Sequence, residues 1–219
     1  MKTQKSKKAD FMTLKLDMSK AYDQVEWRFL IEIMKKMGFC DTWLALIHSC
    51  ISTVSYSILV NGEPKGEISP TRGIRQGDPL SAYLFLLCLE GLNRMLQQDA
   101  RDNLIRGFSL CKNGPKITHQ FFVDDSLLFC QARMEDLQAI QHILSLYKGA
   151  SAQQINQGKT TLFFSKAVTE DKKEEILNFL GVLEIKEYEK YLGLPVVVGK
   201  KKKESLNFIK ERVWAKLQD

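Results

Sequence analysis

The 219-residue sequence lacks any apolar run approaching the roughly 18 residues that a membrane-spanning helix needs. Its N-terminus is basic, but it has no apolar core of the kind that a secretory signal contains. The sequence also has no internal repeat and no low-complexity tract, and its hydrophobic content of 44% is typical of a globular chain. We therefore expect a soluble intracellular protein, cytoplasmic or nuclear, with no membrane partner and with one large or two small domains.

The cysteines show no C-x-x-C spacing, which argues against a zinc site. They lie mostly among apolar residues, so we expect buried free thiols in a reducing compartment. The five are Cys40, Cys50, Cys88, Cys111 and Cys130. The three histidines are scattered and fit core or surface positions better than ligand positions.

Positive charge is in mild excess, with a formal net charge of +6 and a pI near 9.0. This balance suits a nucleic-acid partner without requiring one. The excess is uneven, because four lysines lie within the first eight residues and another cluster spans Lys200 to Lys203. A lysine run is also what an ordinary solvated surface contains.

Two adjacent carboxylates interrupt a strongly apolar stretch. Phe121–Val123 and Leu127–Cys130 are strand-forming runs, joined by Asp124, Asp125 and Ser126, which predicts a β-hairpin. Tight hairpin turns favour Asn-Gly or Asp-Gly, so the Asp-Asp pair gains nothing from turn geometry. Like charges this close raise one another's pKa unless a cation neutralises them, and a divalent metal would do so. The alternative is an ordinary turn with an Asx-type residue.

The order of the expected elements predicts a split βαβ topology. Strand 11–17 is followed by helices 25–37 and 42–52, a hairpin over 56–68 and a buried helix 80–97. A strand around 105–110, the 117–123 and 126–130 hairpin, helix 134–148 and strand 160–164 come next, then helix 169–180, a strand pair within 188–198 and helix 202–217. A right-handed crossover makes strands 11–17 and 117–123 parallel and places strand 126–130 between them, antiparallel to both. Since neighbouring strands lie about 4.8 Å apart, Asp17 should reach the Asp124–Asp125 pair.

Five segments, in order, resemble successive blocks of the reverse transcriptase palm of LINE-type retrotransposons that lack long terminal repeats. They are L-K-L-D-M-S-K-A-Y-D-Q-V-E-W, R-G-I-R-Q-G-D-P-L-S, F-V-D-D, I-N-Q-G-K-T and Y-L-G-L-P. The resemblance starts at about Phe11 and implies an α+β polymerase palm: a ferredoxin-like antiparallel sheet backed by helices, with a primer-grip hairpin and a C-terminal helix. The implied regions are a basic extension 1–10, a palm with partial fingers 11–183, primer-grip strands 184–199 and a basic helix 200–219.

The resemblance implies an RNA-directed DNA polymerase that joins a dNTP to a primer 3′-hydroxyl by two-metal catalysis. Asp17, Asp124 and Asp125 would hold two Mg²⁺ ions, with the Met18 carbonyl assisting, and Mn²⁺ could substitute. The implied partners are an RNA template, a DNA primer and the dNTP. The oligomeric state stays open.

The same resemblance implies roles around the metals. Tyr22 would exclude a 2′-hydroxyl, Gln76 and Gly77 would line the nucleotide pocket, and Arg72 would contact phosphates. Lys159 would protonate the leaving pyrophosphate. The primer grip would be Tyr191, Leu192 and Gly193. The alternatives are a core tyrosine at 22, a surface arginine at 72 and an exposed loop lysine at 159.

Several features depart from the family pattern. Val123 stands where alanine is usual, and Ala82 replaces a usual proline. Most of the fingers, the thumb, and any endonuclease or RNase H region are expected to be missing. We therefore expect a truncated retrotransposon fragment that does not sustain DNA synthesis alone. The alternative is a non-catalytic nucleic-acid-binding remnant of the same fold.

Overall fold

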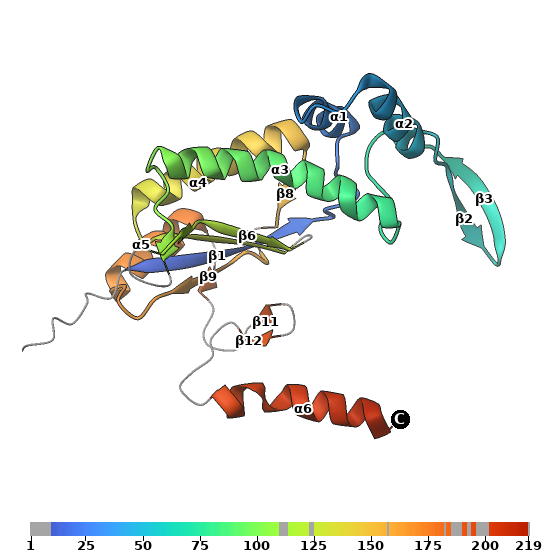
Figure 1. Ribbon diagram of the computed structural model, residues 1–219. Helices are drawn as coiled ribbons and strands as arrows, with labels where there is room; N and C mark the ends of the chain where they lie inside the picture. Colours follow the sequence, from blue (N-terminus) through green and yellow to red (C-terminus); the bar gives the residue numbers. More distant parts are fainter. Residues whose placement is uncertain are drawn as a thin grey trace, which may run out of the picture.

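The computed structural model describes residues 10–109, 114–122, 125–156, 158–181, 183–184, 190–191, 194–195 and 202–218. The helices in these ranges are α1 (Trp27–Lys36), α2 (Asp41–Ser52), α3 (Pro79–Arg101), α4 (Met134–Ser151), α5 (Glu170–Leu180) and α6 (Lys202–Gln218). The strands are β1 (Phe11–Ser19), β2 (Tyr56–Val60), β3 (Glu63–Ile68), β4 (Phe108–Ser109), β5 (Lys116–Ile117), β6 (His119–Phe122), β7 (Asp125–Gln131), β8 (Gln154–Ile155), β9 (Thr161–Phe164), β10 (Leu183–Glu184), β11 (Lys190–Tyr191) and β12 (Leu194–Pro195). Figure 1 shows their arrangement.

One sheet, ordered β10-β9-β1-β7-β6 with β8 also on β1, organises the molecule (Figure 1). Strand β7 is antiparallel to both β1 and β6 and lies between them, so the predicted split βαβ order is confirmed. Strand β9 pairs with the other edge of β1, also antiparallel. Strand β1 is thus the central strand, and its hydrogen-bonding edges are both occupied.

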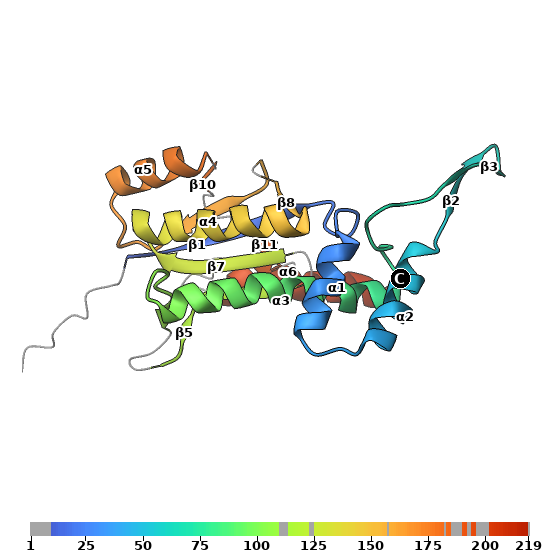
Figure 2. The same ribbon diagram turned by 90° about the horizontal axis from the view of Figure 1, so that it is seen from above.

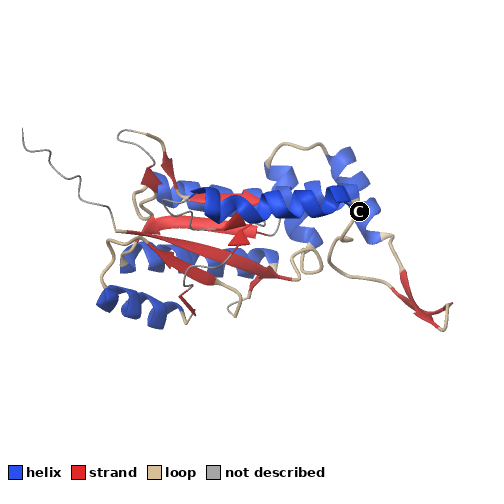
Figure 3. Ribbon diagram, turned by 90° about the horizontal axis from the view of Figure 1, so that it is seen from below, coloured by secondary structure: helices blue, strands red, loops and turns tan. Residues whose placement is uncertain are grey.

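The two faces of β1 differ in burial. Met12, Leu14, Leu16 and Met18 are buried, while the residues between them are only half-buried. This period of two is that of a strand with one face on the core. Helices α3 and α4 lie over one face of the sheet, and β11, β12 and α6 lie on the other side (Figures 1 and 3). The residues on the second face, including Asp17, therefore point away from the main core.

Local sequence signals account for several element ends. The Asp78 side chain accepts a hydrogen bond of 2.8 Å from the Leu80 N–H, with Pro79 at the first helical position of α3. Asn61 and Gly62 both have positive φ, as the Asn-Gly hairpin turn between β2 and β3 requires. Gly181 ends α5 in the left-handed conformation.

Several predicted details are wrong. Helix α3 runs on to Arg101, and Leu86, expected to be buried, is 48% exposed because its position on the helix faces away from the core. The strand expected around 105–110 is reduced to β4. Helix α2 begins at Asp41, one residue earlier than predicted, and its N-cap is Cys40. At the hairpin, Asp125 already belongs to β7, where the sequence had suggested a turn residue.

The expectation for the cysteines holds only in part. Cys88 and Cys130 are buried free thiols, and burial raises the pKa of Cys88 to about 12. Cys40 and Cys50 are free but exposed, which contradicts the prediction. They lie on or beside α2, which buries only the stripe of Leu44, Ile47 and Ile51.

No helix in the described ranges is both long enough and apolar enough to span a bilayer.

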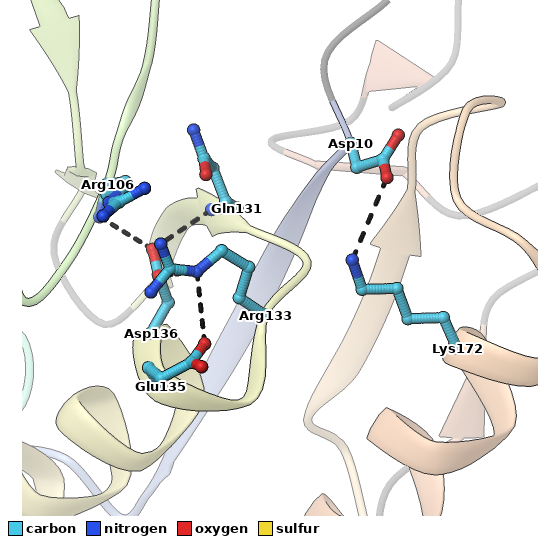
Figure 4. A network of polar contacts seen from close by, with 7 residues as sticks. All are labelled: Asp10, Arg106, Gln131, Arg133, Glu135, Asp136 and Lys172. Atoms are coloured by element: carbon cyan, nitrogen blue, oxygen red, sulfur yellow. Dashed lines mark hydrogen bonds and ion pairs between the residues drawn. The ribbon is translucent and has the colours of Figure 1, made fainter.

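A buried carboxylate fixes the start of α4 (Figure 4). Asp136 is fully buried and accepts hydrogen bonds from the backbone N–H groups of Arg106, at 2.7 Å, and Gln131, at 3.4 Å. Arg133 lies 3.3 Å away and also reaches the exposed Glu135 at 3.2 Å. Burial raises the pKa of the Asp136 carboxyl, and these donors oppose that rise. The carboxylate therefore joins α4 to the end of β7 and to the chain after α3.

Replacing Asp136 with alanine should lower the free energy of unfolding by about 1–3 kcal/mol, because two part-buried N–H groups lose their buried acceptor. Urea unfolding followed by circular dichroism measures the change. Glu135→Ala is the matched control, since it removes a carboxylate from the same turn on the solvent side. Equal stability of the two variants would contradict a structural role for Asp136.

Candidate active site

The carboxylates of β1 and β7 face each other. The strand register places Asp17 directly opposite Asp125, and Phe122 of β6 opposite Asp125 on its other side. Directly opposed residues of an antiparallel pair have Cα atoms about 4.5–5.5 Å apart and point to the same face. The predicted proximity of Asp17 to the hairpin is therefore confirmed. Asp124 and Val123 lie outside the described residues.

The chemistry of this pair fits a divalent cation. Both side chains are half-buried, and within the described part of the chain no hydrogen bond or ion pair joins either carboxylate to another side chain. Like charges directly opposite one another destabilise a sheet. Carboxylate oxygens are hard donors that suit Mg²⁺ or Mn²⁺. Among described residues there is no cluster of three or more His, Cys, Asp or Glu that could hold a metal, so any third carboxylate would come from outside them.

A cavity of about 450 Å³ opens beside Asp17. Its lining comes from the end of β1, the turn that follows, the segment before α3 and the loop after β8: Asp17, Met18, Ser19, Lys20, Ala21, Tyr22, Asp23, Gln76, Asn156 and Lys159. Five of the residues predicted from the sequence therefore share one hollow, although they are far apart along the chain. They are Asp17, Met18, Tyr22, Gln76 and Lys159.

A ring contact and a hydrogen bond fix the turn that carries Tyr22. The half-buried Tyr22 ring stacks on Phe85 of α3, with ring centroids 5.1 Å apart. The buried Gln153 donates a hydrogen bond of 2.8 Å from Nε2 to the Ala21 carbonyl. Tyr22 thus packs on the core and also lines the cavity. The prediction of a residue that contacts the sugar and the alternative of a core tyrosine are therefore compatible.

The segment before α3 runs along the same turn. The N–H groups of Gly73 and Ile74 donate to the carbonyls of Val25, at 2.8 Å, and Tyr22, at 3.0 Å. A Cβ atom on Gly73 would lie 2.8 Å from the Asp23 carbonyl oxygen, and its φ is +89°, so only glycine fits. This close approach brings Gln76 into the cavity lining.

Two other predicted residues of this segment lie outside the lining. Gly77 is exposed and adopts a φ of +89°. Arg72 pairs at 3.4 Å with Glu26 on the surface. The observed position of Arg72 thus fits the surface-arginine alternative better than a place in the cavity.

The loop after β8 brings Lys159 to the strand that carries Asp17. Met18 of β1 pairs with Ile155, and the Asn156 N–H donates to the Asp17 carbonyl at 2.8 Å. The Lys159 N–H in turn donates to the Asn156 carbonyl at 3.1 Å. Asn156 lies in the I-N-Q-G-K-T segment, but its contribution was not predicted. Neither was that of Gln153, whose partner is a carbonyl 132 positions away, and no sequence signal reveals such a contact.

The strand pair near the C-terminus is present. In β11 and β12, Lys190 pairs with Pro195 and Tyr191 with Leu194, as an antiparallel hairpin requires. Leu192 and Gly193 lie outside the described residues. The predicted hairpin is therefore confirmed, while its contact with a primer stays a prediction.

The sheet order and the helices on one face fit the α+β fold of a polymerase palm. The family described as "Reverse transcriptase (RNA-dependent DNA polymerase)" matches residues 1–194, and the chain belongs to this family. Reverse transcriptases generally use divalent metal ions and bind a nucleic-acid template.

Relatives agree with this assignment, and a solved structure shares the fold. The chain is 30% identical over 120 residues to a Pol polyprotein of the R2DM retrotransposable element of Drosophila melanogaster, covering 54% of this chain and 10% of that protein. It is also 30% identical over 128 residues to an R2 Pol polyprotein of Popillia japonica, covering 58% and 20%. The chain thus spans a fifth or less of these relatives. The telomerase of Candida tropicalis superposes with a TM-score of 0.56 at 15% identity, over 76% of this chain and 33% of that one.

Binding of a metal at this site should change the unfolding temperature. In chelator, Asp125→Asn should be more stable than the unsubstituted protein by about 0.2–1 kcal/mol, because it removes a like-charge cross-strand pair. Added Mg²⁺ should raise the unfolding temperature of the unsubstituted protein more than that of Asp125→Asn, since a ligand stabilises the state it binds. Asp41→Asn, on the exposed side of α2, should keep the full Mg²⁺ response. The same Mg²⁺ shift in all three proteins would rule out binding at Asp125.

Proposed function

We propose that the chain is the catalytic core of an RNA-directed DNA polymerase, which transfers a nucleotide from a dNTP to a primer 3′-hydroxyl on an RNA template. The observation that carries this proposal is the pairing of Asp17 with Asp125 beside the cavity. The burial pattern of β1 and the strand register put both carboxylates on the face opposite the buried one, which is where a nucleic acid could approach.

The donor set suits Mg²⁺, with Mn²⁺ as a substitute. Asp17, Asp124, Asp125 and the Met18 carbonyl would hold two ions. When bound, the ions would activate the primer hydroxyl and neutralise the charge that develops on the triphosphate.

The other residues would place the nucleotide and move a proton. Tyr22 would contact the sugar, and Gln76 with Gly77 would line the path of the base and template. Lys159 would donate its Nζ proton to the leaving pyrophosphate as a general acid. Arg72, paired with Glu26, would reach a phosphate only by leaving that partner. Tyr191, Leu192 and Gly193 would contact the primer, within strands 184–199 that follow a palm at 11–183.

Single-nucleotide addition tests the proposal without requiring repeated synthesis. The purified chain, in excess over a DNA primer annealed to RNA, should add the complementary deoxynucleotide in Mg²⁺ and not in chelator. Asp125→Asn should abolish the addition, because it removes a charge from the metal site, while Asp41→Asn should retain it. If the unsubstituted chain and Asp125→Asn were indistinguishable, the proposed chemistry would be wrong. Binding of the primer–template without addition would point to a binding module.

Sugar selectivity tests the place given to Tyr22. Tyr22→Ala should raise ribonucleotide relative to deoxynucleotide incorporation by at least about tenfold, equivalent to about 1.4 kcal/mol, because the ring that would meet the 2′-hydroxyl is removed. Tyr22→Phe keeps the ring and its stacking on Phe85 and should keep the selectivity. The measurement is the ratio of kcat/KM values for the two nucleotides. An unchanged ratio in Tyr22→Ala would leave Tyr22 as a core residue only.

A further inference from the structure

One carbonyl oxygen holds the loop that carries Lys159. The Asn156 carbonyl accepts hydrogen bonds from the Lys159 N–H at 3.1 Å and the Thr160 N–H at 2.9 Å. It also accepts a third from the Thr160 hydroxyl, at 2.8 Å. Through its own N–H, Asn156 donates to the carbonyl of Asp17 at 2.8 Å. A continuous set of four hydrogen bonds therefore connects the metal-site strand to Lys159.

Three of these four hydrogen bonds join backbone groups, and the Thr160 hydroxyl supplies the fourth. Thr160 is 5% exposed and directly precedes β9, whose Thr161 pairs with Lys15 of β1. Its backbone is thus fixed to the sheet on one side, and its Oγ1 reaches back across the loop to Asn156. The loop between β8 and β9 is closed at both ends on β1, and Lys159 lies on it next to this closure.

We propose that Thr160 is a positioning residue for Lys159. Its hydroxyl closes the loop so that the Lys159 side chain faces the cavity beside Asp17. The inference rests on the proposed function, because it assumes that Lys159 donates a proton there. Proton transfer requires heavy atoms within about 2.6–3.2 Å, and a displacement of 1 Å can cost about a hundredfold in rate. A single hydroxyl that limits the movement of the loop can therefore matter far more for rate than for folding.

The surroundings of Thr160 allow its hydroxyl to be removed without disrupting the fold. Thr160 borders a second, largely apolar cavity of about 270 Å³ whose lining includes Leu14, Leu16 and Ile155. A valine methyl in place of the hydroxyl would lie against the Asn156 carbonyl oxygen, which is 2.8 Å from Oγ1, so Thr160→Ala is the variant that removes the hydroxyl without crowding. The Asn156 carbonyl would still accept two backbone N–H groups, so no buried acceptor would be left unpaired.

The test is a double-mutant cycle between Thr160 and Lys159 in single-turnover nucleotide addition. Thr160→Val should slow the addition at least about tenfold and leave the apparent dissociation constant of the nucleotide unchanged. Thr160→Ser keeps the hydroxyl and should restore the rate. In a Lys159→Ala background, Thr160→Val should have no further effect. Thr160→Ala gives the same comparison if the valine variant does not fold.

Two results would overturn the inference: an equal loss of rate from Thr160→Val in the presence and absence of Lys159, or a failure of Thr160→Ser to restore the rate. The first would mean that Thr160 acts through the fold or through Asp17. Failure of the proposed function itself is distinguishable, because Asp125→Asn would then match the unsubstituted chain before any change is made at Thr160.

Discussion

The candidate site depends on the register between β1 and β7. The pairing runs from Phe11 opposite Gln131 to Asp17 opposite Asp125, so the two carboxylates meet only if every preceding pair is in place. A slip of one residue would move Met12, Leu14 and the rest of the buried set to the open face. Burying these side chains therefore fixes the register, and it offsets the repulsion between two like charges at the end of the strands.

The walls of the cavity are fixed mainly by backbone contacts. The segment before α3 donates hydrogen bonds to carbonyls of the turn that carries Tyr22. Asn156 donates to the carbonyl of Asp17, and Gln153 donates to that of Ala21. Figure 2 shows α3, α4 and β1 from above. Side chains that face the cavity are thus placed by the main chain that carries them. Phosphoryl transfer gains most from positioning and charge stabilisation, and a rigid frame of this kind supplies the first.

The sequence predicted the sheet order and five of the cavity residues, because the hydrophobic period of two and the hairpin determine which strands are neighbours. The burial predicted for Leu86, Cys40 and Cys50 is wrong, because the hydrophobic pattern of a helix does not show which of its sides other elements cover. The prediction also missed Gln153, Asn156 and Thr160, since their partners are backbone carbonyls that leave no trace in residue type. Asp124, Leu192 and Gly193 lie outside the described residues and stay predictions, as do the roles of the cavity residues.

The most direct test of the account is the location of a bound metal. Crystals of the chain grown with Mn²⁺ and a deoxynucleoside triphosphate would show the ion by its anomalous scattering. We expect a peak within coordination distance, about 2–2.6 Å, of carboxylate oxygens from both Asp17 and Asp125, on the sheet face that α3 and α4 leave open. A peak elsewhere, or strands paired with Asp17 opposite a residue other than Asp125, would contradict it.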